Sequence, residues 1–245
     1  MRSLLLRLVH YVISLGQLLY GLLVWLQGPA WKKPRLETGR SLKKVPAHVG
    51  LLLLEDDFSL ADLANMIVWS VTLGVSYISI YDINGEVKRN SLLLQQNIHV
   101  SKEQVFGHDI SSCDIQIFSS SHPVLQSPSA PPKSHAANVH LLCVDDGHRN
   151  IVQAARHLSQ LVSAGIYRLQ DIQPPSVDTL VQEWTQFPDP DLCLKFGAVD
   201  SLLGYLPWQT RLSEIISLPS HKGITYKSFL SSMIQYGNTD QRFGK

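Results

Sequence analysis

Hydrophobic and polar residues alternate in blocks along most of the chain. A short continuous apolar run at 48–54 (HVGLLLL) is typical of a parallel strand that is covered on both faces. The next block, 59–71, repeats apolar residues at helical spacing and opens on Ser59, a residue type favoured at helix N-caps. The pattern therefore predicts a strand followed by an amphipathic helix.

The same rhythm continues toward the C-terminus. We expect further strands at 76–81, 114–118, 139–144 and 191–196, and further helices near 86–96, 150–163, 177–184 and 226–236. Apolar runs too short for helices, separated by helical stretches, predict an α/β domain built on a parallel sheet. Residues 119–136 are rich in Ser, Pro and His and predict a surface loop.

The first 44 residues differ from the rest. The run at 8–26 has no residue that is charged at neutral pH, and it matches the roughly 20 residues that cross a bilayer. We expect a single membrane helix, with an interfacial or re-entrant segment and a cleaved signal peptide as alternatives. Lysine and arginine gather after the run, at 32–44, which predicts a cytosolic domain and a short luminal N-terminus. We therefore divide the chain into a membrane segment with a basic linker, 1–44, and one domain, 45–245.

Composition narrows the possible function classes. Hydrophobic residues make up 44% of the 245 positions and charged residues 17%, so the chain is too apolar to be disordered. The net charge of +1 argues against a nucleic-acid-binding protein. The three cysteines are widely spaced and predict neither a metal knuckle nor a disulfide framework, which indicates a reducing compartment.

Two acidic groups lie where open α/β sheets bind ligands. Residues 55–57 (EDD) follow the first strand, and they either belong to a ligand site or cap the next helix. Residues 145–149 (DDGHR) either hold phosphate at a helix start or form a turn between strand and helix. The strings GxxxxGK[ST], GxGxxG, HExxH and GxSxG do not occur, and the ten histidines lack ligand-like spacing.

Four segments carry a resemblance to a known family: residues 46–50 (PAHVG), 68–90, 188–221 and the terminal QRFGK. Together they resemble the cis-prenyltransferases, and in particular the accessory subunits of the eukaryotic enzymes that make dehydrodolichyl diphosphate. The resemblance implies the parallel-sheet fold of that family, preceded by an N-terminal membrane helix. It also implies a location in the endoplasmic reticulum membrane, with the C-terminal domain in the cytosol.

Catalytic members of this family carry two phosphate-binding signatures from which this chain departs. An Asp-Gly-Asn-Arg-Arg motif follows their first strand, where this chain has LEDDF at 54–58. Their Arg-Thr-Ser-Gly-Glu stretch corresponds here to Lys195 and FGAVD at 196–200, and a lysine lacks the bidentate fork of arginine. The resemblance therefore implies a chain that is inactive alone and holds no metal itself. Mg²⁺ would be held mainly by the catalytic partner and the substrate diphosphates.

The C-terminus fits a family motif that completes the partner's active site. In the family, an Arg-x-Gly motif reaches across the dimer interface, and Arg242, Phe243 and Gly244 match it. By this resemblance, Arg242 and Gly244 take part in catalysis. The three residues together help to bind isopentenyl diphosphate in the partner.

A further stretch resembles the region through which the family's subunits touch. Its interface candidates are Trp208, Arg211 and Glu214, since tryptophan and arginine are typical interface anchors. An equally good alternative is a Trp208 packed in the domain's own core, with Arg211 and Glu214 paired nearby.

The resemblance implies a role as accessory subunit of a heteromeric enzyme. The complex would add isopentenyl diphosphate units to farnesyl diphosphate and make the precursor of dolichol for protein glycosylation. This chain would activate, stabilise and anchor the catalytic subunit. The alternative is a membrane receptor or scaffold that binds Nogo-B, and a sterol-transfer protein is left open as a further partner.

Overall fold

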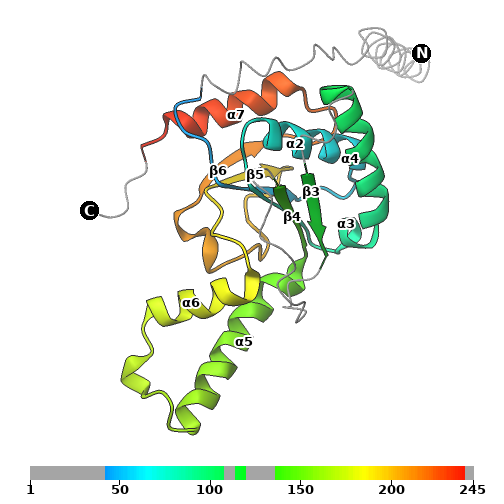
Figure 1. Cartoon of the computed structure of the whole chain (residues 1–245). Coiled ribbons are helices and arrows are strands. Elements are labelled where there is room, and N and C mark those ends of the chain that lie inside the picture. Colours follow the sequence, from blue (N-terminus) through cyan, green and yellow to red (C-terminus); the bar gives the residue numbers. More distant parts are fainter. Residues whose placement is uncertain (1–41, 108–113, 120–135, 241–245) are drawn as a thin grey trace, which may run out of the picture. The chain divides into compact units, whose positions relative to one another are not determined.

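A computed structural model describes residues 42–107, 114–119 and 136–240 (Figure 1). The chain separates into two compact units, 1–34 and 35–245, and the first lies outside the described residues. The expected membrane segment at 8–26 and most of the expected loop at 119–136 also lie outside them. In the described part of the chain, no helix is long and apolar enough to cross a lipid bilayer.

A sheet of six strands forms the centre of the domain, and it is parallel, as the sequence predicted. Its order is β3-β4-β2-β1-β5-β6. The strands are β1 (His48–Leu53), β2 (Tyr77–Asp82), β3 (Asp114–Phe118), β4 (Ala136–Leu142), β5 (Leu192–Phe196) and β6 (Glu214–Leu218).

Six α-helices and two short 3₁₀ helices connect or follow these strands within the described residues. They are α2 (Leu60–Thr72), α3 (Glu86–Arg89), α4 (Ser91–Phe106), α5 (Val144–Ser163), η3 (Leu169–Asp171), α6 (Pro174–Thr185), η4 (Gln209–Leu212) and α7 (Tyr226–Asn238).

The first strand and helix form as their residue patterns predicted. All six residues of β1 are buried, as expected for a strand with neighbours on both sides and cover on both faces. The N-cap of α2 is Ser59, whose side chain accepts a hydrogen bond from the Asp62 amide at 3.3 Å. The β1–α2 unit is therefore determined by local patterns.

Three boundaries differ from the prediction. The expected helix at 86–96 is two helices, α3 and α4, because the chain breaks at Asn90, whose side chain bonds back to the Glu86 carbonyl. The expected strand at 139–144 is β4, which ends at Leu142, and α5 begins at Val144 instead of residue 150. Strand β6 was missed because its exposed and buried residues mix at the edge of the sheet.

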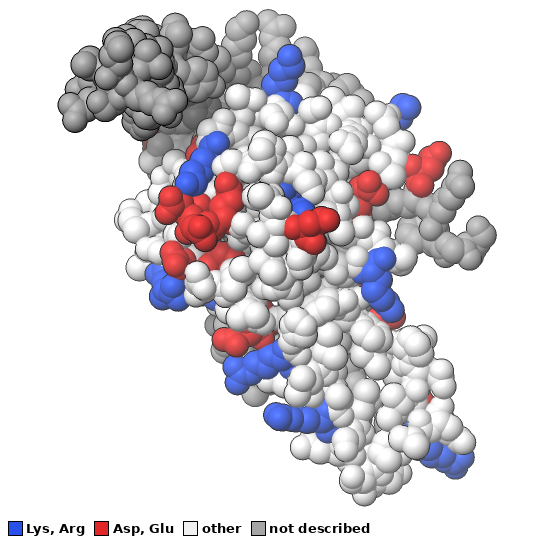
Figure 2. Space-filling model, turned by 180° about the vertical axis from the view of Figure 1, so that it is seen from behind, with Lys and Arg blue, Asp and Glu red and all other residues white. Residues whose placement is uncertain are grey.

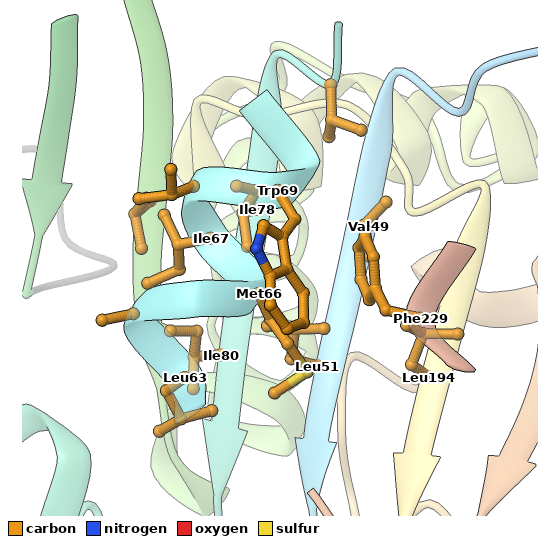
Figure 3. Packing of buried hydrophobic residues seen from close by; sticks show 14 of the residues in the cluster. Val49, Leu51, Leu63, Met66, Ile67, Trp69, Ile78, Ile80, Leu194 and Phe229 are labelled. Carbon is orange, nitrogen blue, oxygen red and sulfur yellow. The ribbon is translucent and has the colours of Figure 1, made fainter. Parts of the chain in front are cut away.

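The main core lies between one face of the sheet and helices α2, α4 and α7. Figure 3 shows Leu63, Ile67 and Trp69 of α2 directed at the strands, with Phe229 of α7 beside Val49. Trp69 also meets Phe229 with ring centroids 5.7 Å apart. This packing holds α7 against the sheet.

The other face of the sheet is covered differently. Residues 197–206 cross it, and Tyr205 and Leu206 are buried there with Leu52 and Leu142. Helices α5 and α6 pack on each other and extend together away from the sheet (Figure 1). We call residues 144–185 the α5–α6 lobe.

Candidate functional site

The carboxyl ends of all six strands lie at one edge of the sheet, because every pair is parallel. Open α/β sheets bind ligands at this edge. The segments that follow β1, β4, β5 and β6 meet here. The positions that correspond to the family's two phosphate-binding signatures follow β1 and β5. Their contacts decide what this edge can hold.

After β1, the Glu55 carboxylate is bound by the segment after β6. It contacts Nδ1 of His221 and accepts a hydrogen bond from the His221 amide at 3.1 Å. The Ser59 amide donates to Nε2 of the same ring at 2.9 Å, so the ring proton lies on Nδ1 and points to Glu55. His221 is completely buried.

These contacts change the acidity of Glu55. Partial burial opposes ionisation, but hydrogen bonds from Ser220 and His221 outweigh it and lower the pKa of Glu55. The carboxylate is therefore ionised at neutral pH. Its hydrogen bonds join the β1–α2 segment to the β6–α7 segment.

The other two acidic residues of this group are exposed. Asp57 pairs only at the surface with Lys222, whose Nζ lies 3.2 Å away, and Asp56 is also exposed. The cap of α2 is Ser59, so the alternative in which residues 55–57 cap that helix is wrong. Within the described ranges, no three His, Cys, Asp or Glu side chains gather as a metal site would require.

After β5, Lys195 is bound by the loop that follows it. Its side chain is buried, and Nζ donates to the Val199 carbonyl at 2.6 Å and to the Asp200 carboxylate at 3.3 Å. Both hydrogen bonds of the ammonium group are therefore to residues of the loop that follows β5. This is the place at which the family's second phosphate-binding signature was expected.

A buried chain of hydrogen bonds lies under the 197–206 segment. Tyr205 donates to Ser79 at 2.6 Å, Ser79 to Nε2 of His48 at 2.8 Å, and Nδ1 of His48 to the Pro188 carbonyl at 2.6 Å. Burial lowers the pKa of His48 to about 4, so the ring is neutral and fits this order of donors. Every polar group in this series of hydrogen bonds is paired, which fixes the 197–206 segment on the sheet.

The expected phosphate or turn motif at 145–149 is the first turn and a half of α5. Asp146 accepts from the Cys143 amide at 2.7 Å and pairs with Lys88 at 2.5 Å. A Cβ on Gly147 would lie 2.0 Å from the Gly204 carbonyl oxygen, so this glycine lets the 197–206 segment cross the helix. The turn interpretation is wrong, because these residues are helical; they lie at a helix start, and phosphate binding there stays a prediction.

Two interface candidates meet on the α5–α6 lobe. The Asp178 carboxylate of α6 accepts from Nε1 of Trp208 at 2.5 Å and from Arg211 at 2.9 Å. The Arg211 guanidinium also lies 4.8 Å from the Trp208 ring centre. Arg211 thus pairs with Asp178 instead of Glu214, which starts β6 and is half-buried.

Trp208 borders an apolar cleft of about 450 Å³ between α5 and α6. Its wall includes Ile151, Leu158, Leu169 and Val177. Figure 2 shows that uncharged surface predominates on the lobe in that view. Such a surface is suited to contact with another apolar surface.

The C-terminal candidates Arg242, Phe243 and Gly244 lie outside the described residues. Sequence analysis missed His221, Tyr205 and Ser79, whose partners are far away in the chain. Gly50 within an otherwise apolar strand was a usable signal, since a glycine there indicates that another group approaches closely. The group is Tyr205, whose hydroxyl would lie 2.4 Å from a Cβ at Gly50.

Comparisons with known proteins give a consistent result. No family model matches the chain. It is 41% identical over 208 residues to the dehydrodolichyl diphosphate synthase complex subunit Nus1 of Mus musculus, covering 84% of this chain and 68% of that protein. The subunit of the same name from Homo sapiens is 41% identical over 209 residues, covering 84% and 69%.

A solved structure shares the fold. Lavandulyl diphosphate synthase from Lavandula x intermedia aligns with a TM-score of 0.56 and 17% identity, over 82% of this chain and 99% of that one.

Proposed function

The chain belongs to the family of Nus1 subunits of the dehydrodolichyl diphosphate synthase complex, and from this premise we propose that it is the non-catalytic accessory subunit of such a complex. The complex adds isopentenyl diphosphate units to farnesyl diphosphate and makes the polyprenyl precursor of dolichol. This chain activates and stabilises the catalytic subunit and holds it at the membrane.

The proposal rests on the contacts at the two positions where catalytic members of the family carry their phosphate-binding signatures. Glu55 is bound by His221, and Lys195 is bound by the Val199 carbonyl and Asp200. A charge-assisted hydrogen bond contributes about 1.5–3 kcal/mol, so losing several of them removes most of the affinity for a diphosphate. These contacts support a chain that is inactive alone.

The C-terminal motif supplies what the catalytic subunit lacks. The Arg242 guanidinium offers a fixed positive fork to phosphate, and Gly244 lets its backbone amide approach closely because it has no Cβ. Together with Phe243, they help to hold isopentenyl diphosphate in the partner's site. Mg²⁺ neutralises diphosphate charge there, and the partner and the substrates hold it, since the described carboxylates of this chain offer no cluster for it.

The catalytic subunit docks on the α5–α6 lobe and the adjacent start of β6. The apolar cleft continues to Trp208, so it is contiguous with the interface candidates Trp208, Arg211 and Glu214. Ile166 and Leu169 on the lobe are 69% and 78% exposed, which is costly for large apolar side chains unless a partner covers them.

The N-terminal segment places the complex in the endoplasmic reticulum membrane. The uncharged run at 8–26 is long enough to span the bilayer, and the basic residues that follow it favour a cytosolic domain.

One assay tests this function. We would measure incorporation of labelled isopentenyl diphosphate onto farnesyl diphosphate by this chain, by a catalytic subunit, and by the pair, each with Mg²⁺ and with a chelator. We expect activity only for the pair with Mg²⁺. Gly244→Ala should lower turnover of the pair about tenfold or more while the two chains still co-purify, because the added Cβ blocks a backbone contact with phosphate.

The matched control is Gln241→Ala, which changes a residue next to the Arg242–Gly244 motif and leaves the motif itself intact. Equal turnover for Gly244→Ala and the wild-type chain would mean that the tail does not take part in catalysis. Activity of this chain alone would contradict the accessory role.

A further inference from the structure

The point where the chain enters the domain lies beside the point where it leaves. Leu42 and Val45 pack against the main core, to which Phe229, Met233 and Tyr236 of α7 also belong. In Figure 1 the first described residues, in blue, pass beside the C-terminal half of α7, in red. We call residues 42–45 the entry segment.

Two contacts join the entry segment to the last turn of α7. The Lys44 ammonium lies 4.7 Å from the centre of the Tyr236 ring, within the range of a cation–π contact. The next residue, Gly237, lies so close that an added Cβ would be 3.2 Å from the Lys44 carbonyl oxygen and 3.8 Å from the Lys43 amide nitrogen. The backbone of the entry segment therefore runs directly along the helix end.

Tyr236 contributes its ring to this contact and not its hydroxyl group. The residue is only 1% exposed, and its hydroxyl has no hydrogen-bond partner in the described part of the chain. A buried hydroxyl without a partner costs stability. The ring, by contrast, packs in the core and faces Lys44.

The last turn of α7 determines where the C-terminal tail begins. The helix ends at Asn238, and Arg242 follows four residues later. Four residues span at most about 14 Å when fully extended. The position of the helix end therefore limits the region that Arg242 can reach.

We propose that the entry segment holds the last turn of α7, with Lys44 as a positioning residue for the C-terminal tail. The membrane-proximal linker and the tail that completes the partner's site are thereby coupled through the contacts of the entry segment with α7. This inference rests on the proposed function, because it assigns the tail to the binding of isopentenyl diphosphate.

Full-length variants in complex with a catalytic subunit test this coupling. Lys44→Met keeps the aliphatic stem and removes the charge. Because an exposed cation–π contact is modest, we expect the KM for isopentenyl diphosphate to rise about two- to fivefold. The KM for farnesyl diphosphate and the thermal midpoint of the complex should stay unchanged, which separates positioning from general stability.

Three further variants serve as controls. Lys43→Met removes the neighbouring charge, which is equally exposed, and should leave both KM values unchanged. Lys44→Arg retains a cation and should behave as the wild-type chain. Tyr236→Phe retains the ring and should also leave the KM values unchanged.

The outcomes separate the inference from the function on which it rests. If the wild-type chain activates its partner but Lys44→Met behaves as Lys43→Met does, the positioning role is wrong and the accessory function stands. A rise in both KM values by the same factor would also overturn the positioning role. If the wild-type chain fails to activate the partner, both proposals are wrong.

Discussion

Gly50 lies in β1 opposite Tyr205, and the missing side chain makes room for a buried hydroxyl. The Tyr205 hydroxyl sits there because it donates to Ser79, which in turn bonds to His48. One glycine thus permits a chain of paired polar groups beneath the 197–206 segment. At the scale of single residues, the attachment of the 197–206 segment to the sheet depends on this fit.

Replacing Gly50 by alanine tests the fit. The new Cβ would lie 2.4 Å from the Tyr205 hydroxyl, so the ring must move and its bond to Ser79 must break. Overpacking of this kind costs about 1–3 kcal/mol, and we expect a loss of that size in the free energy of unfolding, measured with urea.

The double variant Gly50→Ala with Tyr205→Phe removes the clashing hydroxyl. It should lose less stability than the sum of the two single variants. Additive losses would mean that the Gly50–Tyr205 contact is not the cause.

Helices α5 and α6 differ from the other described helices in how they are covered. Helices α2, α4 and α7 bury apolar side chains against the sheet, whereas α5 and α6 mainly contact each other. The segment between them contains Ile166 and Leu169, which are strongly exposed. At the scale of elements, this lobe is the part of the described domain best suited to a partner.

Replacing Leu169 by serine tests the lobe as a docking surface. Because the side chain is 78% exposed, the free energy of unfolding of the chain alone should change by no more than about 0.5 kcal/mol. If the catalytic subunit covers it, the lost burial should weaken the complex about tenfold, measured as the Kd.

The matched control is Leu92→Ser on α4, because Leu92 is 75% exposed on another helix. Its Kd should equal that of the wild-type chain. Equal affinity for all three chains would remove the lobe from the interface.

The whole chain combines an apolar N-terminal run with a domain whose described helices do not span a membrane. The unit formed by residues 35–245 contains the described sheet, its helices and the tail. We therefore expect activation of the partner and attachment to the membrane to be separable functions of one molecule.

Removing residues 1–34 tests this separation. The full chain should float with lipid vesicles in a density gradient, and the 35–245 chain should stay at the bottom, because the apolar run at 8–26 is absent. Both should activate the catalytic subunit in detergent. Flotation of the shorter chain would assign membrane attachment to the domain instead.

Local patterns in the sequence were sufficient for much of the fold. The apolar run of β1 and the Ser59 cap of α2 follow from residue type and spacing, which act over a few neighbours. The strand-and-helix rhythm predicted the parallel sheet, and segments such as 188–221 indicated the family. These features need no knowledge of distant contacts.

Only the tertiary structure decided how the carboxyl edge is closed and how the 197–206 segment is held on the sheet. Glu55 and His221 are 166 positions apart, and Tyr205 and Ser79 are 126 apart, so no local pattern connects them. The start of α5 and the edge strand β6 also depend on what packs beside them. Sequence determined the elements because their periodicity is local; the structure decided the closed edge and the Lys44–Tyr236 contact because such pairs form only when folded loops meet.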